Sequence, residues 1–192
     1  EPTPTLSLQN EMNVLLKESG PQEEWNVTFG GDKYDLFFTV QETSDGCFIA
    51  CGGTNATGFD IGGDCWLIKT DTNGNMLWNR TFGGTKTDNG HGLLQTTDGG
   101  FIISAITESF GAGSADAWVI KTDAMGNEEW NKTYGGSLYD STGKTITQTP
   151  DGGYLIAGST QSFGTGGRDG WLIKINRTGD EQWNKTYGTQ YN

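Results

Sequence analysis

Cysteine has the most distinctive side-chain chemistry in this chain of 192 residues, and all three copies fall in the first repeat, at Cys47, Cys51 and Cys65. Cys47 and Cys51 are four residues apart in one apolar run, roughly 13 Å along a strand, which is too far for a disulfide. Cys65 lies in the next apolar run, so a Cys51–Cys65 disulfide is allowed if the two runs are antiparallel strands. The alternative is three small buried thiols. We expect no zinc site, because paired cysteine spacings are missing and there is one histidine.

The single histidine, His91, is the other candidate for chemistry. A general base needs a nucleophile or an acid that it can activate or orient. No serine or cysteine constellation in the sequence is anchored by His91. We therefore expect no catalytic residues and predict that the chain is not an enzyme.

Six aspartates recur at regular intervals and could bind a cation. They form two sets, Asp35, Asp88 and Asp140, and Asp64, Asp116 and Asp169. One interpretation is a ring of carboxylates that binds Ca²⁺, with the second set as the candidate ligands. The interpretation that we favour is that each aspartate caps backbone amides in its own turn. We therefore predict no metal and no cofactor, with Ca²⁺ as the alternative.

Six asparagines stand in Asn-x-Ser/Thr sequons and could carry glycans. They are Asn26, Asn55, Asn79, Asn131, Asn176 and Asn184. Four of them recur at one position of a predicted strand, on the face that we expect to be exposed. In a secreted protein such residues accept N-linked glycans. The alternative is that Asn and Thr are the polar residues of an edge strand and form cross-strand hydrogen bonds.

These side chains are positioned by a phrase that occurs four times, Trp-Asn-x-Thr-Phe/Tyr-Gly. It begins at Trp25, Trp78, Trp130 and Trp183, so its period is 52 or 53 residues. A fixed period near fifty indicates an array of identical supersecondary units. A residue that is present in every copy is expected to hold the repeat together, and a residue present in one copy marks the place to look for a special site.

Each repeat has the pattern of four short strands. A strand ending in Gln is followed by an Asp-Gly turn, which is a strong hairpin signal. The second strand is the most apolar, and the third reads Trp-x-Ile-Lys from Trp66, Trp118 and Trp171. A second glycine turn leads to the fourth strand, which carries the Trp-Asn-x-Thr phrase. Four antiparallel strands in about fifty residues are typical of a β-propeller blade, with both faces of the middle strands buried and the fourth strand half exposed.

The repeats resemble a known class of tandem repeat. The run Trp-Asn-Lys-Thr-Tyr-Gly-Gly, then Asp-Gly-Gly-Tyr-x-Ile-Ala-Gly, then Asp-x-Trp-Leu-Ile-Lys, best seen in residues 130–174, is similar to the β-propeller-type repeats of about 52 residues in secreted and surface-anchored archaeal and bacterial proteins. Surface proteins of methanogens are among them. The resemblance implies a propeller-like fold and an extracellular location, and it implies no activity.

We predict an all-β fold, a β-propeller-like array of three four-stranded antiparallel blades plus one surplus strand. The repeat domain is 25–192, with the surplus strand at 25–31 and blades at 33–84, 86–136 and 138–188; residues 1–24 form an N-terminal arm or cap. Closed propellers typically need four or more blades, so this array is open unless another copy completes it. The chain is then a fragment of a longer array, a member of a ring of copies, or a subunit of a head-to-tail polymer that donates its surplus strand.

Composition narrows the function classes further. The formal net charge is −12, which disfavours nucleic acid and anionic membranes as partners, and no apolar run is long enough to span a bilayer. We predict a structural glycoprotein, extracellular or at the cell surface, that self-assembles with copies of itself into a fibre, sheath or ring. The alternative is an adhesion module whose loops with Phe110 and Phe163 bind a glycan or a protein, or a fragment of a longer surface propeller.

Overall fold

The computed structural model describes residues 24–56 and 63–190, which form three four-stranded antiparallel sheets and no helix. The first sheet contains β1–β4, the second β5–β8 and the third β9–β12, each in chain order. The strands are β1 (Tyr34–Glu42), β2 (Phe48–Ala56), β3 (Asp64–Thr70), β4 (Met76–Phe82), β5 (Asp88–Gln95), β6 (Phe101–Thr107), β7 (Asp116–Thr122), β8 (Glu128–Tyr134), β9 (Asp140–Gln148), β10 (Tyr154–Thr160), β11 (Asp169–Ile175) and β12 (Glu181–Tyr187). The predicted all-β class and the three groups of four strands are confirmed.

The hairpin turns form where the Asp-Gly pairs predict them. Gly46, Gly99 and Gly152 have φ of 76°, 86° and 80°, the left-handed region that glycine adopts without steric cost. The aspartate before each glycine holds the turn; for example, Asp98 Oδ1 accepts a hydrogen bond of 3.0 Å from the Gly100 amide. This local chemistry fixes the register of β1–β2, β5–β6 and β9–β10.

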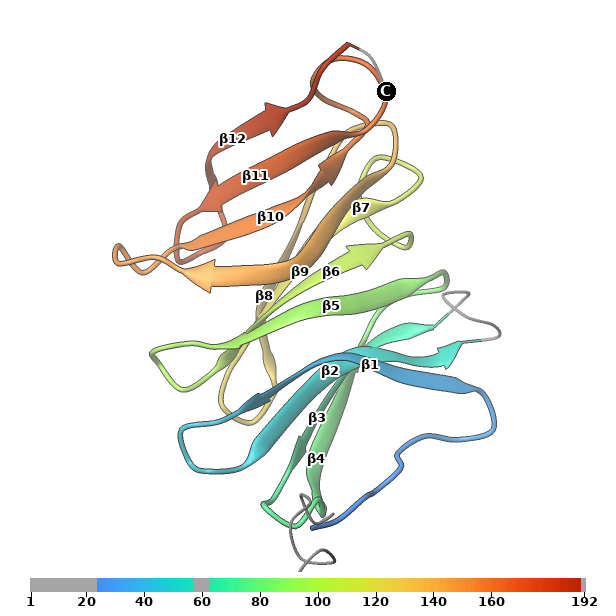
Figure 1. Cartoon of the computed structure of the whole chain (residues 1–192), viewed down its shortest axis with the longest axis vertical. Helices are drawn as coiled ribbons and strands as arrows, with labels where there is room; N and C mark the ends of the chain where they lie inside the picture. The colour runs from blue at the N-terminus through green and yellow to red at the C-terminus, as the bar shows by residue number, and fades with distance from the viewer. Residues whose placement is uncertain (1–23, 57–62, 191–192) are drawn as a thin grey trace, which may run out of the picture.

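The second sheet lies between the other two (Figure 1). We define the front face of each sheet as the face that carries the third-strand tryptophan, Trp66, Trp118 or Trp171, and the rear face as the opposite one. The rear of the first sheet, including Leu67 and Phe82, packs on the front of the second in one apolar core. The rear of the second packs on the front of the third in the same way.

Burial along the strands follows from this stacking. Every residue of β6 and β7 is buried, because both faces of the second sheet are covered. The outermost strand β4 alternates, with Trp78 and Phe82 turned toward the second sheet and Asn79 and Thr81 exposed. The predicted difference between middle and outer strands is therefore confirmed in the first two sheets.

The innermost strands of the three sheets converge. The pairing register shifts between Phe37 and Thr39 in β1 and between Gly90 and Gly92 in β5, so Phe38 and His91 are the extra residues of β-bulges. A bulge re-aims the side chain of its extra residue. The Phe38 ring meets the His91 ring edge-on at 5.2 Å, and Lys144 Nζ from β9 lies 5.1 Å from the Phe38 ring centroid. The first and third sheets thus touch at this inner edge.

The predicted surplus strand at 25–31 is wrong as secondary structure. Residues 24–31 form no strand, because no third strand lies beside them to supply hydrogen bonds. The predicted blade ranges each enclose one observed sheet. The predicted arm or cap lies outside the described residues, except for Glu24.

Candidate interaction surfaces

The front of the first sheet carries an apolar groove of about 530 Å³. Its lining includes Phe37 and Val40 of β1, Phe48 and Ala50 of β2, and Ile68 of β3. Val40 is 68% exposed, although it lies opposite Ala50 of the apolar strand β2. A β-sheet face of this kind is normally covered by a second layer, and here the covering is incomplete.

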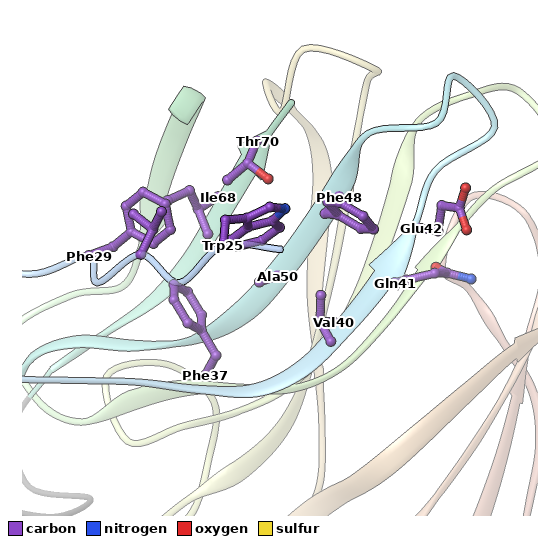
Figure 2. A pocket seen from close by; sticks show the side chains of 11 residues that line it. Trp25, Phe29, Phe37, Val40, Gln41, Glu42, Phe48, Ala50, Ile68 and Thr70 are labelled. Atoms are coloured by element: carbon purple, nitrogen blue, oxygen red, sulfur yellow. The ribbon is translucent and has the colours of Figure 1, made fainter. Parts of the chain in front are cut away.

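The segment of residues 25–29 crosses this groove. Figure 2 shows Trp25 beside Phe48, Ile68 and Thr70. The Trp25 and Phe48 ring centroids are 6.0 Å apart with an interplanar angle of 52°, and Trp25 Nε1 donates a 3.0 Å hydrogen bond to the Thr72 carbonyl. Trp25 nevertheless remains 41% exposed, so the segment covers the groove only in part.

The same contact occurs at both junctions between sheets. Trp78 of β4 meets Phe101 at 6.0 Å and 58°, and Trp130 of β8 meets Tyr154 at 6.3 Å and 55°.

In each of these contacts a glycine lies against the indole ring. A Cβ atom on Gly74, Gly126 or Gly179 would lie within 3 Å of Trp25, Trp78 or Trp130, respectively. Residues 25–29 therefore take, on the first sheet, the position that an outermost strand takes on the next sheet.

The rear of the third sheet is the other uncovered face. Trp183 and Tyr187 of β12 are 40% and 59% exposed, whereas Tyr134, at the position of Tyr187 in the second sheet, is buried. In the pairing register Lys174 lies opposite Trp183 and Leu172 opposite Lys185, so these four side chains share the rear face. This face has the residue pattern of the two covered rear faces.

The aspartates at the start of β1, β5 and β9 hold the ends of their own sheets. Asp88 Oδ2 accepts hydrogen bonds from the Gly84 amide at 2.8 Å and from Ser109 Oγ at 2.6 Å. Asp35 and Asp140 accept equivalent bonds from Gly31 and Gly136. Burial opposes ionisation of Asp35 and Asp140. Hydrogen bonds from the side chain of Thr54 to Asp35 and from those of Ser162 and Thr160 to Asp140, together with the glycine amides, outweigh it and lower the pKa of both. This is the capping role that the sequence favours.

The second set of aspartates lies close to the first set across the sheet junctions. A Cβ atom on Gly83 would lie 2.2 Å from Asp64 Oδ1 and 3.0 Å from Asp88 Oδ2, so the two carboxylates flank this glycine. Burial, and then the charge of Asp88, raise the pKa of Asp64. Asp116 and Asp140 flank Gly135 in the same way.

The candidate calcium ligands form no shared site. Asp64, Asp116 and Asp169 stand at the starts of three different strands. Asp116 Oδ2 accepts hydrogen bonds from the amides of its own loop at residues 112 and 113. Within the part of the chain that the structure describes, no three His, Cys, Asp or Glu side chains are grouped to hold a metal ion.

Three of the sequon asparagines bind the indole of a third-strand tryptophan. Asn79, Asn131 and Asn184 each accept a hydrogen bond from the indole of Trp66, Trp118 or Trp171, at 3.4, 3.0 and 3.2 Å. They are exposed, as predicted, but glycosylation stays a prediction.

The remaining sequons differ from these three. Asn176 closes the β11–β12 turn, where its Nδ2 donates to Asp180 at 3.1 Å. Asn55 is exposed with a φ of 61°, and Asn26 is exposed beside Trp25.

The predicted cysteine pair is brought together. Cys51 Sγ and Cys65 Sγ are 3.9 Å apart, both side chains are fully buried, and both are unbonded thiols. A Cβ atom on Gly90 would lie 2.2 Å from the first sulfur and 2.7 Å from the second. Cys47 is separate and half-buried. The disulfide stays a prediction.

The remaining candidates fit structural roles. His91 Nδ1 lies 3.4 Å from the Thr142 carbonyl at the inner edge of the sheets. Phe110 and Phe163 are 44% and 40% exposed, and each packs on its own sheet's third-strand tryptophan at 5.4 and 5.6 Å. Their loops are thus ordered by internal packing, and binding of a glycan by them stays a prediction.

Sequence reasoning missed a buried lysine that is repeated in every sheet. Lys121 is 2% exposed, and its Nζ lies 3.1 Å from Asp98 Oδ2 and 2.9 Å from Glu129 Oε2. Lys69 and Lys174 pair with Asp45 and Asp151 in the same way. The signal was present, because the lysine ends the Trp-x-Ile-Lys motif and an aspartate precedes each hairpin glycine.

Comparisons with known proteins bear on the fold alone. No protein family matches the sequence, and no curated protein matches it. The crystal structure of a protein of unknown function from Bacteroides caccae is similar, with a TM-score of 0.52 at 12% identity over 79% of this chain. The chain spans under half of that protein, 46% of its length. Residues 24–56 and 63–190 contain no helix long and apolar enough to span a bilayer.

Proposed function

We propose that this chain is a structural repeat protein, an open arc of three propeller blades that assembles head to tail with copies of itself. One observation carries the proposal. The first sheet's front has an apolar groove, and the third sheet's rear presents Trp183 and Tyr187, at the positions that a tryptophan and a Phe or Tyr fill at both internal junctions.

The contact would be heterologous, because two different faces meet. A heterologous contact repeats from copy to copy, and it gives a ring if the rotation closes and a fibre if it does not. Convergence of the sheets at Phe38, His91 and Lys144 supports an arc around an axis. The resemblance of the repeat to surface proteins, together with the exposed sequon asparagines, supports an extracellular or cell-surface location.

The test is sedimentation velocity over a concentration series, with negative-stain images of the same sample. We expect particles whose mass rises with concentration. A monodisperse monomer at every concentration would refute the proposal and favour a binding module or a fragment.

Two surface variants test the polarity of the contact. Val40→Arg puts a charge in the groove, and Trp183→Arg puts one on the opposite face; Met125→Arg, which changes an exposed apolar residue in a turn of the second sheet, is the matched control. Each blocked variant should be monomeric alone, and a mixture of the two should give one complex of two chains. If Trp183→Arg alone still dimerises, the contact joins like faces and the head-to-tail arrangement is wrong.

A further inference from the structure

We infer that the groove on the first sheet is the docking site for β12 of a second copy, and that residues 25–29 occupy this site as an internal placeholder until β12 displaces them. The inference rests on the proposed function and names its contact. It commits to a second copy because the chain itself contains the same contact twice, at the junctions made by β4 and β8.

The placeholder and the proposed occupant have matching residues. Residues 25–29 read Trp-Asn-Val-Thr-Phe, and residues 183–187 read Trp-Asn-Lys-Thr-Tyr. Both can place an indole against Phe48 and Gly74, as Trp25 does. The two segments therefore cannot occupy the groove at the same time.

The two residues that differ favour the second copy. In the second sheet, the Tyr134 hydroxyl donates a 2.5 Å hydrogen bond to the Gly179 carbonyl, and Lys132 pairs with Asp180. Tyr187 could make the first contact with the Gly74 carbonyl, whereas Phe29 has no hydroxyl. Lys185 would approach Asn75 as Arg80 approaches Asn127, at 3.4 Å in the first junction, whereas Val27 has no donor.

The placeholder is the segment that is easier to release. β12 is paired with β11 from Gly170–Tyr187 to Ile175–Glu181, so its removal would break a ladder of backbone hydrogen bonds. Residues 24–31 have no strand pairing, and Trp25 is 41% exposed. Gly30, with a φ of 142°, and Gly31 lie between the segment and β1 and can act as a hinge.

The first residue of β11 is the third sheet's counterpart of an aspartate that lies at each internal junction. Asp169 Oδ1 is buried and accepts no hydrogen bond from any described residue. At the internal junctions the equivalent aspartates, Asp64 and Asp116, lie beside the first aspartate of the next sheet. In the proposed contact Asp169 would lie beside Asp35 of the second copy.

Two full-length variants with opposite expected effects test the inference. Trp25→Ala weakens the placeholder, and Val27→Lys/Phe29→Tyr makes it identical to residues 183–187. If the site is free in about a tenth of the molecules, Trp25→Ala should lower the apparent Kd of assembly by about tenfold, because apparent affinity scales with the competent fraction. The double variant should raise the apparent Kd. General destabilisation of the first sheet would not produce effects of opposite sign.

The readout is the apparent Kd from sedimentation, together with hydrogen exchange of the amides of residues 25–31. We expect these amides to gain no protection when the wild-type protein assembles, because the released segment pairs with no strand. If assembly is lost in Trp25→Ala, or if the amides become protected on assembly, the segment stays in the junction as a donated strand and the inference is wrong. If neither the wild type nor any variant assembles, the proposed function fails as well.

Discussion

The buried lysine of the second sheet allows a test of what holds each blade together. Lys121 Nζ donates hydrogen bonds to the Thr122 carbonyl at 2.8 Å and to Glu129 Oε2 at 2.9 Å, and it pairs with Asp98. Asp98→Asn/Glu129→Gln removes both negative charges, keeps a side-chain oxygen at residue 98 to accept from the Gly100 amide, and leaves a buried ammonium without a counter-charge. Lys121→Met would instead remove the charge and retain most of the side-chain volume.

The two variants should differ in their free energy of unfolding. An uncompensated buried charge costs about 3–5 kcal/mol, and we take about 3 here, because the Asp98 and Glu129 side chains are 59% and 48% exposed and water can enter from their side. Lys121→Met loses a hydrogen bond to Thr122, about 1 kcal/mol. The double variant should therefore be about 2 kcal/mol less stable than Lys121→Met.

Urea unfolding followed by tryptophan fluorescence measures this difference. With a slope of roughly 2 kcal/mol per M, the midpoints should differ by about 1 M. Lys132→Met is the matched control, because its ion pair with Asp180 is at the surface and should contribute much less than a buried pair. If Lys121→Met is as destabilising as the double variant, the ion pair itself is the source of stability and our reasoning is wrong.

Three further predictions concern packing, acid stability and modification. Gly90→Ala should destabilise the protein by about 1–3 kcal/mol in urea unfolding, because its Cβ would collide with the two buried sulfurs, whereas Gly31→Ala, with no atom within 4 Å, should have little effect. The hydrogen bond from Lys132 lowers the pKa of Asp180 to about 2, below the unfolded value of about 3.9. The stability that the ionised Asp180 contributes is therefore present above about pH 4 and lost as the pH falls toward 2. Lys132→Ala should flatten the pH dependence of the unfolding free energy in that range, and an unchanged slope would contradict the assignment. Peptide mass spectrometry of native material should find glycans on the exposed sequon asparagines of the outer strands, and unmodified peptides throughout would exclude glycosylation.

Period and turn chemistry made the sheets predictable from the sequence. The Asp-Gly pairs and the apolar runs fixed the two middle strands of each repeat, because both signals are local. The failure at residues 25–31 has a physical cause: the phrase that forms β4, β8 and β12 encodes an outer strand only when a third strand lies beside it. The buried lysine was missed because a charged residue at a strand end is usually exposed, and only the fold brings Asp98 to Lys121.

The differences between the repeats, more than their similarities, bear on how strong the proposed contact would be. At the internal junctions, the Ser44 amide donates to Gln95 Oε1 at 2.8 Å and the Thr97 amide to Gln148 Oε1 at 3.0 Å. The third sheet has Pro150 at this position, which has no N–H to donate. Gln41 Oε1 already accepts from the Gln95 amide, so no buried acceptor is left unpaired.

The contact between copies would thus lack a hydrogen bond worth about 1 kcal/mol that both internal junctions have. It would also bring Asp169 near Asp35, as Asp64 lies near Asp88, where burial and the neighbouring charge raise the pKa of Asp64. A contact with one fewer hydrogen bond and a carboxylate pair is suited to reversible assembly, whereas the internal junctions are held permanently by the chain.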